Sequence, residues 1–85
     1  MEKSAEQRHS EHDVLVRVQT LVTEEHRLLE QIERSDAEHH RLARVQVELD
    51  QCWDLLRQRR ALRETGGDPD LAQVRPPDVV EKYVG

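Results

Sequence analysis

The residues with the most distinctive chemistry lie together in the stretch LDQCWDLLRQRRALRE, Leu49 to Glu64. It contains the only cysteine and the only tryptophan of the chain, Cys52 and Trp53, followed by a cluster of arginines. A cysteine thiolate can act as a nucleophile, and exposed arginines can bind phosphate. The apolar spacing around Cys52, described below, instead predicts a thiol packed between helices. Trp53 is predicted at the edge of that packed region, where it either covers the core or contacts a partner.

The stretch ends with four arginines, Arg57, Arg59, Arg60 and Arg63. Acidic residues are available to them: Glu64 follows Arg60 by four residues, and an antiparallel neighbouring helix would bring Glu11 close. We therefore predict ion pairs and packed side-chain stems. Two alternatives stay open, in which Arg59, Arg60 and Arg63 bind an acidic protein partner or nucleic acid. The net charge of -5 opposes nucleic acid, because that affinity depends on basic side chains displacing counterions from phosphates.

A second polar group, Glu25 and His26 in the segment TEEH, interrupts an apolar stripe. Helical bundles that bind metals use a Glu-x-x-His motif, but Thr23 stands where that Glu would be. We predict instead a buried polar layer of Glu25 and His26 that fixes the register of two helices, bonded to Arg41 or Arg44. A metal site remains the less favoured alternative.

Motifs typical of catalysis are not found in the sequence. It has no Gly-rich phosphate loop, no serine elbow, and no paired Cys or His ligands at zinc spacing. We therefore expect a protein that is not an enzyme and uses no cofactor. One cysteine cannot form an internal disulfide, and neither a signal-peptide segment nor a membrane-length apolar run is present, so a cytoplasmic, reduced protein is expected.

The first element expected to position these residues is a helix over about residues 11–34. Its apolar residues recur at steps of three, four and seven: Leu15, Val18, Val22, Leu29 and Ile32, with Val14, Leu21 and Leu28 along one flank. Ser10 is the predicted N-cap, and Glu11 and Asp13 suit the positive end of the helix. Residues 1–10 are polar and are expected to form a flexible leader.

The second element is a helix over about residues 36–65. Its stripe contains Leu42, Val45, Leu49, Cys52 and Leu56, with Leu55 and Leu62 on one flank and Trp53 on the other. Extending the first register by sevens from Leu29 reaches the polar Asp36, so one continuous helix would turn the second stripe away from the first. The segment SDAE, Ser35 to Glu38, matches a capping box at this point, and Gly66 and Gly67 supply a helix end. An antiparallel hairpin is predicted, and a continuous rod is the alternative.

Residues 67–85 form a tail that contains all three prolines of the chain. Pro76 and Pro77 favour an extended approach, followed by a possible single turn that brings four apolar residues to one face, Val79, Val80, Tyr83 and Val84. We predict that this tail docks on the helices, over the overhanging end of the second. A disordered tail is the alternative.

The stripes of both helices are wider than one neighbouring helix can cover, and the chain is short, at 85 residues with 35% hydrophobic and 2% aromatic residues. Two hairpins packed face to face would give every helix two neighbours. We predict an all-α fold, an antiparallel helical hairpin with an extended C-terminal tail that dimerises into a four-helix bundle. A different helical protein is the alternative partner, and neither nucleic acid nor a membrane is favoured.

The run VELDQCWDLLRQRRALRE, with LVTEEHRLLE upstream and VRPPDVVEKYV downstream, resembles an uncharacterised family of short bacterial proteins, a domain of unknown function. The resemblance covers about Val14 to Val84. It implies a helical-hairpin protein without an assigned activity, cofactor or catalytic residue. The function is therefore predicted from the surfaces alone: a helical self-association or protein-interaction module, or alternatively a nucleic-acid accessory protein that uses the arginine-rich end.

Overall fold

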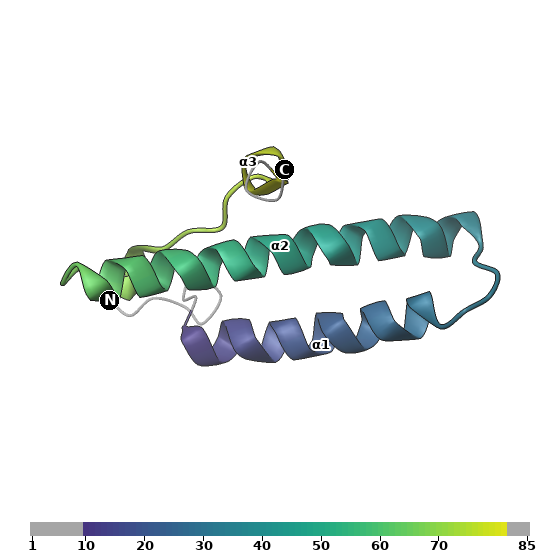
Figure 1. The fold of residues 1–85 in the computed structure, drawn as a ribbon, viewed down its shortest axis with the longest axis horizontal. Coiled ribbons are helices and arrows are strands. Elements are labelled where there is room, and N and C mark those ends of the chain that lie inside the picture. The colour runs from purple at the N-terminus through teal and green to yellow at the C-terminus, as the bar shows by residue number, and fades with distance from the viewer. Residues whose placement is uncertain (1–9, 82–85) are drawn as a thin grey trace, which may run out of the picture.

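The computed structural model describes residues 10–81 and contains two long helices, α1 (Glu11–Leu29) and α2 (Asp36–Glu64). A short 3-10 turn, η2 (Pro69–Leu71), and a one-turn helix, α3 (Pro77–Glu81), follow. The two long helices run antiparallel, and the segment after α2 turns back along the side of α2 that faces away from α1 (Figure 1). No strand occurs among residues 10–81. The predicted all-helical hairpin is confirmed, and the continuous rod is wrong because the helix is interrupted between residues 29 and 36.

Helix α1 begins where the sequence indicated. The Ser10 hydroxyl accepts a hydrogen bond from the backbone N–H of Asp13 at 3.1 Å. The helix ends at Leu29 rather than near residue 34. Arg34 explains the early end, because its Nη1 donates to the carbonyl oxygens of Leu28 at 3.1 Å and Gln31 at 3.3 Å. A side chain thus satisfies carbonyls that further helical turns would otherwise have used.

Helix α2 has the two ends that its sequence predicts. Ser35 Oγ accepts from the N–H of Glu38 at 3.1 Å, and Glu38 Oε1 accepts from the N–H of Ser35 at 3.0 Å, which completes the capping box. At the other end Gly66 has a φ of 79°, and the N–H of Gly67 donates to Leu62 O at 2.7 Å. This Schellman arrangement requires a residue that tolerates the left-handed conformation. It ends α2 and reverses the chain.

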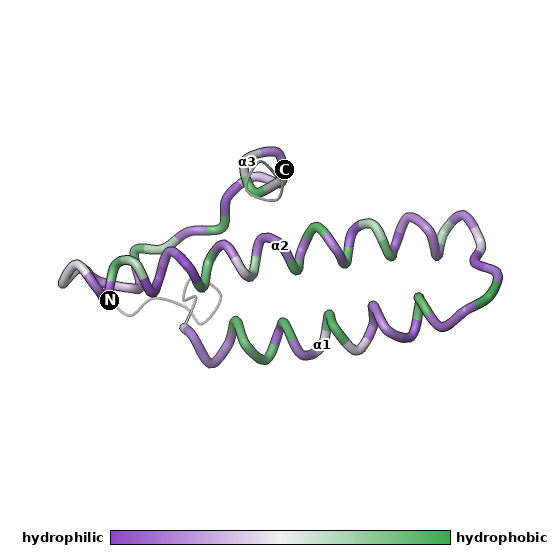
Figure 2. Tube along the Cα trace, in the orientation of Figure 1, coloured by the Kyte–Doolittle hydropathy of each residue, from purple (hydrophilic) through white to green (hydrophobic). Residues whose placement is uncertain are grey.

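The core lies mainly between α1 and α2. Its buried hydrophobic residues are Val14, Val18, Leu21 and Leu28 of α1, and Leu42, Val45, Leu49 and Leu55 of α2, joined by Ala72 of the tail. Hydrophobic stretches of α1 recur on the side that faces α2, and those of α2 occur on both of its sides (Figure 2). The second side of α2 receives η2 and α3, and Val80 is buried there. The tail therefore lies against α2, and its α3 end lies near Ala43 and Val47 in the middle of α2, not over the overhanging end where docking was expected. Tyr83 and Val84 lie outside the described residues.

Candidate functional site

One edge of the hairpin, which we call the charged border, is closed by ion pairs between the helices. Arg41 of α2 donates to both oxygens of Glu24 of α1, from Nε at 2.7 Å and from Nη2 at 2.6 Å. Arg17 of α1 forms the reverse pair with Glu48 of α2. Both helices place these charges seven residues apart, so each pair lies on one face and the signs alternate. The hydrogen bonds from Arg41 lower the pKa of Glu24.

The polar layer predicted from Glu25 and His26 differs from this arrangement. Arg41 pairs with Glu24, while Glu25 is half-buried and His26 is exposed. A carboxylate at the border keeps contact with water, which costs less than the burial that a layer inside the seam would require. The opposite charges at a spacing of seven were the sequence signal for this border. Within residues 10–81, no three His, Cys, Asp or Glu side chains are grouped so that they could hold a metal ion.

The opposite edge, which we call the apolar border, consists of Leu15, Val22 and Leu29 of α1 with Trp53 of α2. The three α1 residues are seven apart and stand about 100° around the helix from the buried column that includes Leu21. Leu15 is 44% exposed, Leu29 50% and Trp53 44%, and Val22 is half-buried. Apolar side chains at helical spacing therefore remain uncovered along this edge.

The helix register brings Trp53 to the same edge as the α1 column. Glu48 and Trp53 lie on opposite sides of the buried Val45, because they follow it by three and by eight residues, or about −60° and +80° around the helix. Glu48 faces Arg17, which fixes the level of the two helices. Leu15 precedes Arg17 by two residues, and Trp53 follows Glu48 by five. Because the helices are antiparallel, Leu15 and Trp53 differ in height along the helix axes by only about 4.5 Å. Trp53 and the α1 column thus form one border.

Three of the four arginines at the end of α2, Arg59, Arg60 and Arg63, are paired with carboxylates, and Arg57 is exposed. Arg60 Nε lies 3.2 Å from Glu64 Oε1, and Arg63 Nη2 lies 2.8 Å from Glu11 Oε1, as predicted. The bond from Arg63 lowers the pKa of Glu11. Arg59 is buried and its Nη1 donates to Asp70 Oδ1 at 3.1 Å and to the Pro69 carbonyl at 3.2 Å, because the tail crosses it. These pairs reduce the positive charge that this end presents to a phosphate.

A further polar group between α2 and the tail was not predicted. Asp54 is buried, and its Oδ2 accepts from Gln58 Nε2 at 2.8 Å and pairs with Arg75 Nε at 3.3 Å. Gln58 and Gln51 also bond to the backbone of the tail. No local pattern identifies such contacts, because aspartate and glutamine are ordinary residues on a helix surface.

Cys52 is half-buried at the seam, where packing was predicted. Burial raises the pKa of its thiol, and the charge of Arg17 offsets this only in part. A thiol with a raised pKa is mostly protonated near neutral pH and is a weak nucleophile. The structure therefore gives Cys52 no activating environment.

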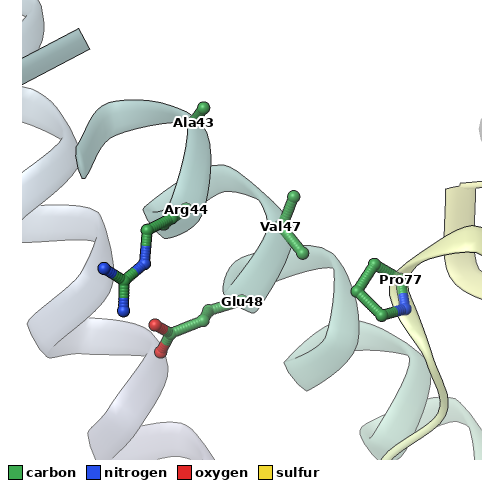
Figure 3. A pocket seen from close by; sticks show the side chains of 5 residues that line it. All are labelled: Ala43, Arg44, Val47, Glu48 and Pro77. Carbon is green, nitrogen blue, oxygen red and sulfur yellow. The ribbon is translucent and has the colours of Figure 1, made fainter. Parts of the chain in front are cut away.

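A shallow hollow of about 290 Å³ lies between α2 and the start of α3. Its lining consists of Ala43, Arg44, Val47, Glu48 and Pro77. The side chains of Arg44 and Glu48 extend to the side of α1, and Pro77 approaches from the tail (Figure 3). This lining contains no nucleophile and no cluster of metal ligands. In the described part of the chain, no helix is both long and apolar enough to cross a membrane.

Comparisons with known proteins agree with the resemblance noted in the sequence. Residues 10–85 match the model of a family described as a protein of unknown function, DUF2630. The uncharacterized proteins Mb0922c of Mycobacterium bovis and Rv0898c of Mycobacterium tuberculosis are each 52% identical to this chain over 77 residues. These alignments cover 86% of this chain and 88% of each relative. No solved structure gives a significant match.

Proposed function

Because the chain belongs to the DUF2630 family of proteins of unknown function, we propose its function from its surfaces: a non-enzymatic helical module that associates with a second copy through the apolar border. Two hairpins paired in this way form a four-helix bundle. The observation that carries the proposal is that Leu15, Leu29 and Trp53 are exposed, with the half-buried Val22 between the two leucines, on the edge that the tail does not cover.

The length and chemistry of this border support a second copy as the occupant. Leu15 to Leu29 spans about 21 Å of helix, most of the length of α1. The four residues of the border carry no charge, so a two-fold symmetric pair would bring no like charges together within it. Leucine and tryptophan side chains left in water on one chain would be buried by such a pairing, which favours association.

The shape of the single chain supports the same proposal. Its Cα radius of gyration is 14.9 Å, whereas a compact chain of this length has about 12 Å. The principal extents are 48 × 31 × 17 Å, so the molecule is flat. In a flat hairpin each long helix is covered by the other only along the seam. A second hairpin packed against the apolar border would give a core of more usual thickness.

The test is the molecular mass in solution, measured by sedimentation at micromolar concentration. The wild-type chain, 10.0 kDa, is expected to have the mass of a dimer. The double variant Leu15→Glu, Leu29→Glu is expected to be a helical monomer, because two charges per chain would face each other across the interface. A wild-type chain that remains a folded monomer at this concentration would refute the proposal.

Val16→Glu is the matched control for this experiment. Val16 lies on the same helix and is 47% exposed, close to the exposure of Leu15 and Leu29. It stands about 200° around the helix from Val14, on the outer surface. The dimer is expected to survive this change. Trp53 fluorescence supplies a second measurement, since dilution or the double variant should expose the indole and shift its emission to longer wavelength.

The arginine-rich end was the alternative site, for nucleic acid. Because Arg59, Arg60 and Arg63 each pair with a carboxylate, the geometry favours the apolar border over that alternative. A binding assay at low salt separates the two proposals, since only a nucleic-acid accessory protein would bind an oligonucleotide in a salt-dependent way. The cytoplasmic location stays a prediction from the sequence.

A further inference from the structure

The second face of α2, which meets the tail, is built largely to bond a polypeptide backbone. Gln58 Nε2 donates to the Gln73 carbonyl at 2.7 Å, and Gln58 Oε1 accepts from the Gln73 N–H at 3.2 Å. Gln51, two helical turns earlier, donates from Nε2 to the Arg75 carbonyl at 3.0 Å. A side-chain amide that bonds both backbone groups of one residue acts as the neighbouring strand would in a sheet. These three bonds do not depend on which side chains the tail carries.

Two charged contacts add selectivity to this backbone contact. Asp54, which is buried, pairs with Arg75, and the buried Arg59 pairs with Asp70 five residues earlier in the tail. Charges removed from water are costly without a partner of opposite sign. The site therefore selects a cation at one position and a carboxylate at the other.

Among the tail side chains that the structure describes, few apolar ones are buried in this contact. Ala72 and Val80 are buried, but Leu71 and Val74 point their apolar side chains into solvent. The helical segments of the described part of the tail are a three-residue turn and a helix of five residues. Gln58 bonds the tail at the exposed surface, and short segments with few buried apolar contacts open at lower free energy than packed helices do. The tail can thus leave the face while the α1–α2 seam stays formed.

We propose that this face of α2 is a recognition site for an extended segment of a partner protein, and that the tail is its built-in competitor. The segment would carry a carboxylate, a small residue two positions later, and an arginine five positions later, as Asp70, Ala72 and Arg75 do here. Backbone bonds from Gln51 and Gln58 hold the segment, and Asp54 and Arg59 select its charges. This site lies on the opposite side of α2 from Trp53 and does not depend on dimerisation.

The test uses the full-length chain and a fluorescent peptide with the sequence of residues 68–78. In the wild type the tail occupies the site at high effective concentration, so the peptide should bind weakly. Arg75→Ala in the protein weakens the tail but leaves the site intact, and peptide affinity should rise about tenfold or more. The same peptide with its arginine replaced by alanine should not bind either protein. Arg57→Ala, a change at an exposed arginine of α2, should leave the affinity at the wild-type value.

Arg75→Lys keeps the test decisive if Arg75→Ala perturbs folding, because lysine retains the positive charge but lacks the guanidinium group that pairs with Asp54. Peptide affinity should then fall between those of the wild type and Arg75→Ala. If the wild type and both Arg75 variants are helical and bind the peptide with equal affinity, the proposal is overturned. If neither the wild type nor either Arg75 variant binds the peptide while all three stay helical, the assignment to a segment of a partner protein is wrong.

Discussion

Helix α2 has two contact faces that are built differently. Toward α1 it presents fully or nearly buried aliphatic side chains, such as Val45 and Leu49, with ion pairs at one border. Toward the tail it presents Gln51, Asp54 and Gln58, which bond to backbone groups and to Arg75. The first face fits one partner in one register, since aliphatic packing depends on the shape of both sides. The second face holds the tail through backbone bonds from Gln51 and Gln58 and through the charged contacts of Asp54 and Arg59.

This difference separates stability from recognition. Aliphatic burial in the seam supplies most of the favourable free energy of folding. Polar bonds to the tail exchange bonds with water for bonds within the protein, so each adds only about 0.5–1.5 kcal/mol. We therefore expect the seam to resist change and the tail face to tolerate exchange of its occupant. The predictions below test this contrast, beginning with the largest effect.

The largest effect is expected from Leu21→Ala. Leu21 is fully buried in the seam, and removing its side chain leaves a cavity that should lower the free energy of unfolding by about 2–5 kcal/mol. Urea unfolding followed by circular dichroism measures the loss. Ile32→Ala, at the fully exposed residue of the turn, is the control and should leave the midpoint unchanged. Equal effects of the two substitutions would contradict the position of the seam.

A smaller and more local effect is expected from Asp54→Ala. The change leaves Arg75 and Gln58 without their buried acceptor and should weaken tail docking by about 1–3 kcal/mol. Hydrogen exchange of the Gln73 N–H should become faster, while exchange within α1 stays as it was. Asp50→Ala, one turn earlier on α2, is the matched control. Global unfolding of Asp54→Ala would show that the tail is part of the main core.

The turn at Gly66, which leads from α2 into the tail, can be tested with Gly66→Ala. Its φ of 79° is unfavourable for alanine, whereas an added Cβ would meet nothing within 4 Å, so the cost of about 1–2 kcal/mol is conformational. Gly66→Asn should lose less, because asparagine tolerates this conformation better. Urea midpoints of the two variants provide the comparison. A reversed order would mean that the chain turns back by another route.

The smallest effect is expected in the dependence of stability on pH under acidic conditions. The pKa of Glu24 is lowered in the folded chain by its hydrogen bonds from Arg41, relative to an ordinary value of 4.5. Its stabilisation is therefore complete above that ordinary value and is lost as the pH falls through the lower, folded pKa. In Arg41→Ala the pKa of Glu24 is no longer lowered by this arginine. The urea midpoint should therefore fall less steeply between about pH 7 and pH 3 than it does in the wild type. Arg44→Ala should keep the wild-type slope, and identical slopes for all three would show that the pair adds nothing.

Features set by neighbouring residues were predictable from the sequence. The capping box at Ser35 and Glu38, the end of α2 at Gly66, and the ion pair of Arg60 with Glu64 all depend on residues within a few positions of one another. The early end of α1 was not predictable, because Gln31 and Ile32 are compatible with a helix. Only the folded turn shows Arg34 bonding the last carbonyls.

The pairing of Arg41 with Glu24 and not with Glu25 was also not predictable from the sequence. Which of two adjacent glutamates meets Arg41 depends on how far α1 is rotated against α2, and rotation is set by the packing of the whole seam. The contacts of Gln51 and Gln58 join positions 24 and 15 residues apart, respectively. Backbone acceptors in an irregular tail leave no periodic trace in a sequence.

The sequence by itself determined the two helices, their antiparallel return and the apolar residues available to a core. Helix propensity, capping and apolar spacing act over a few residues, so the order of the chain is enough to specify them. The tertiary structure alone decided which apolar residues stay exposed at the border with Trp53. It alone also decided which buried charges, Asp54 and Arg59, the tail would meet. Those outcomes depend on the rotation of helices and the path of a tail, which are fixed only when distant parts of the chain pack together.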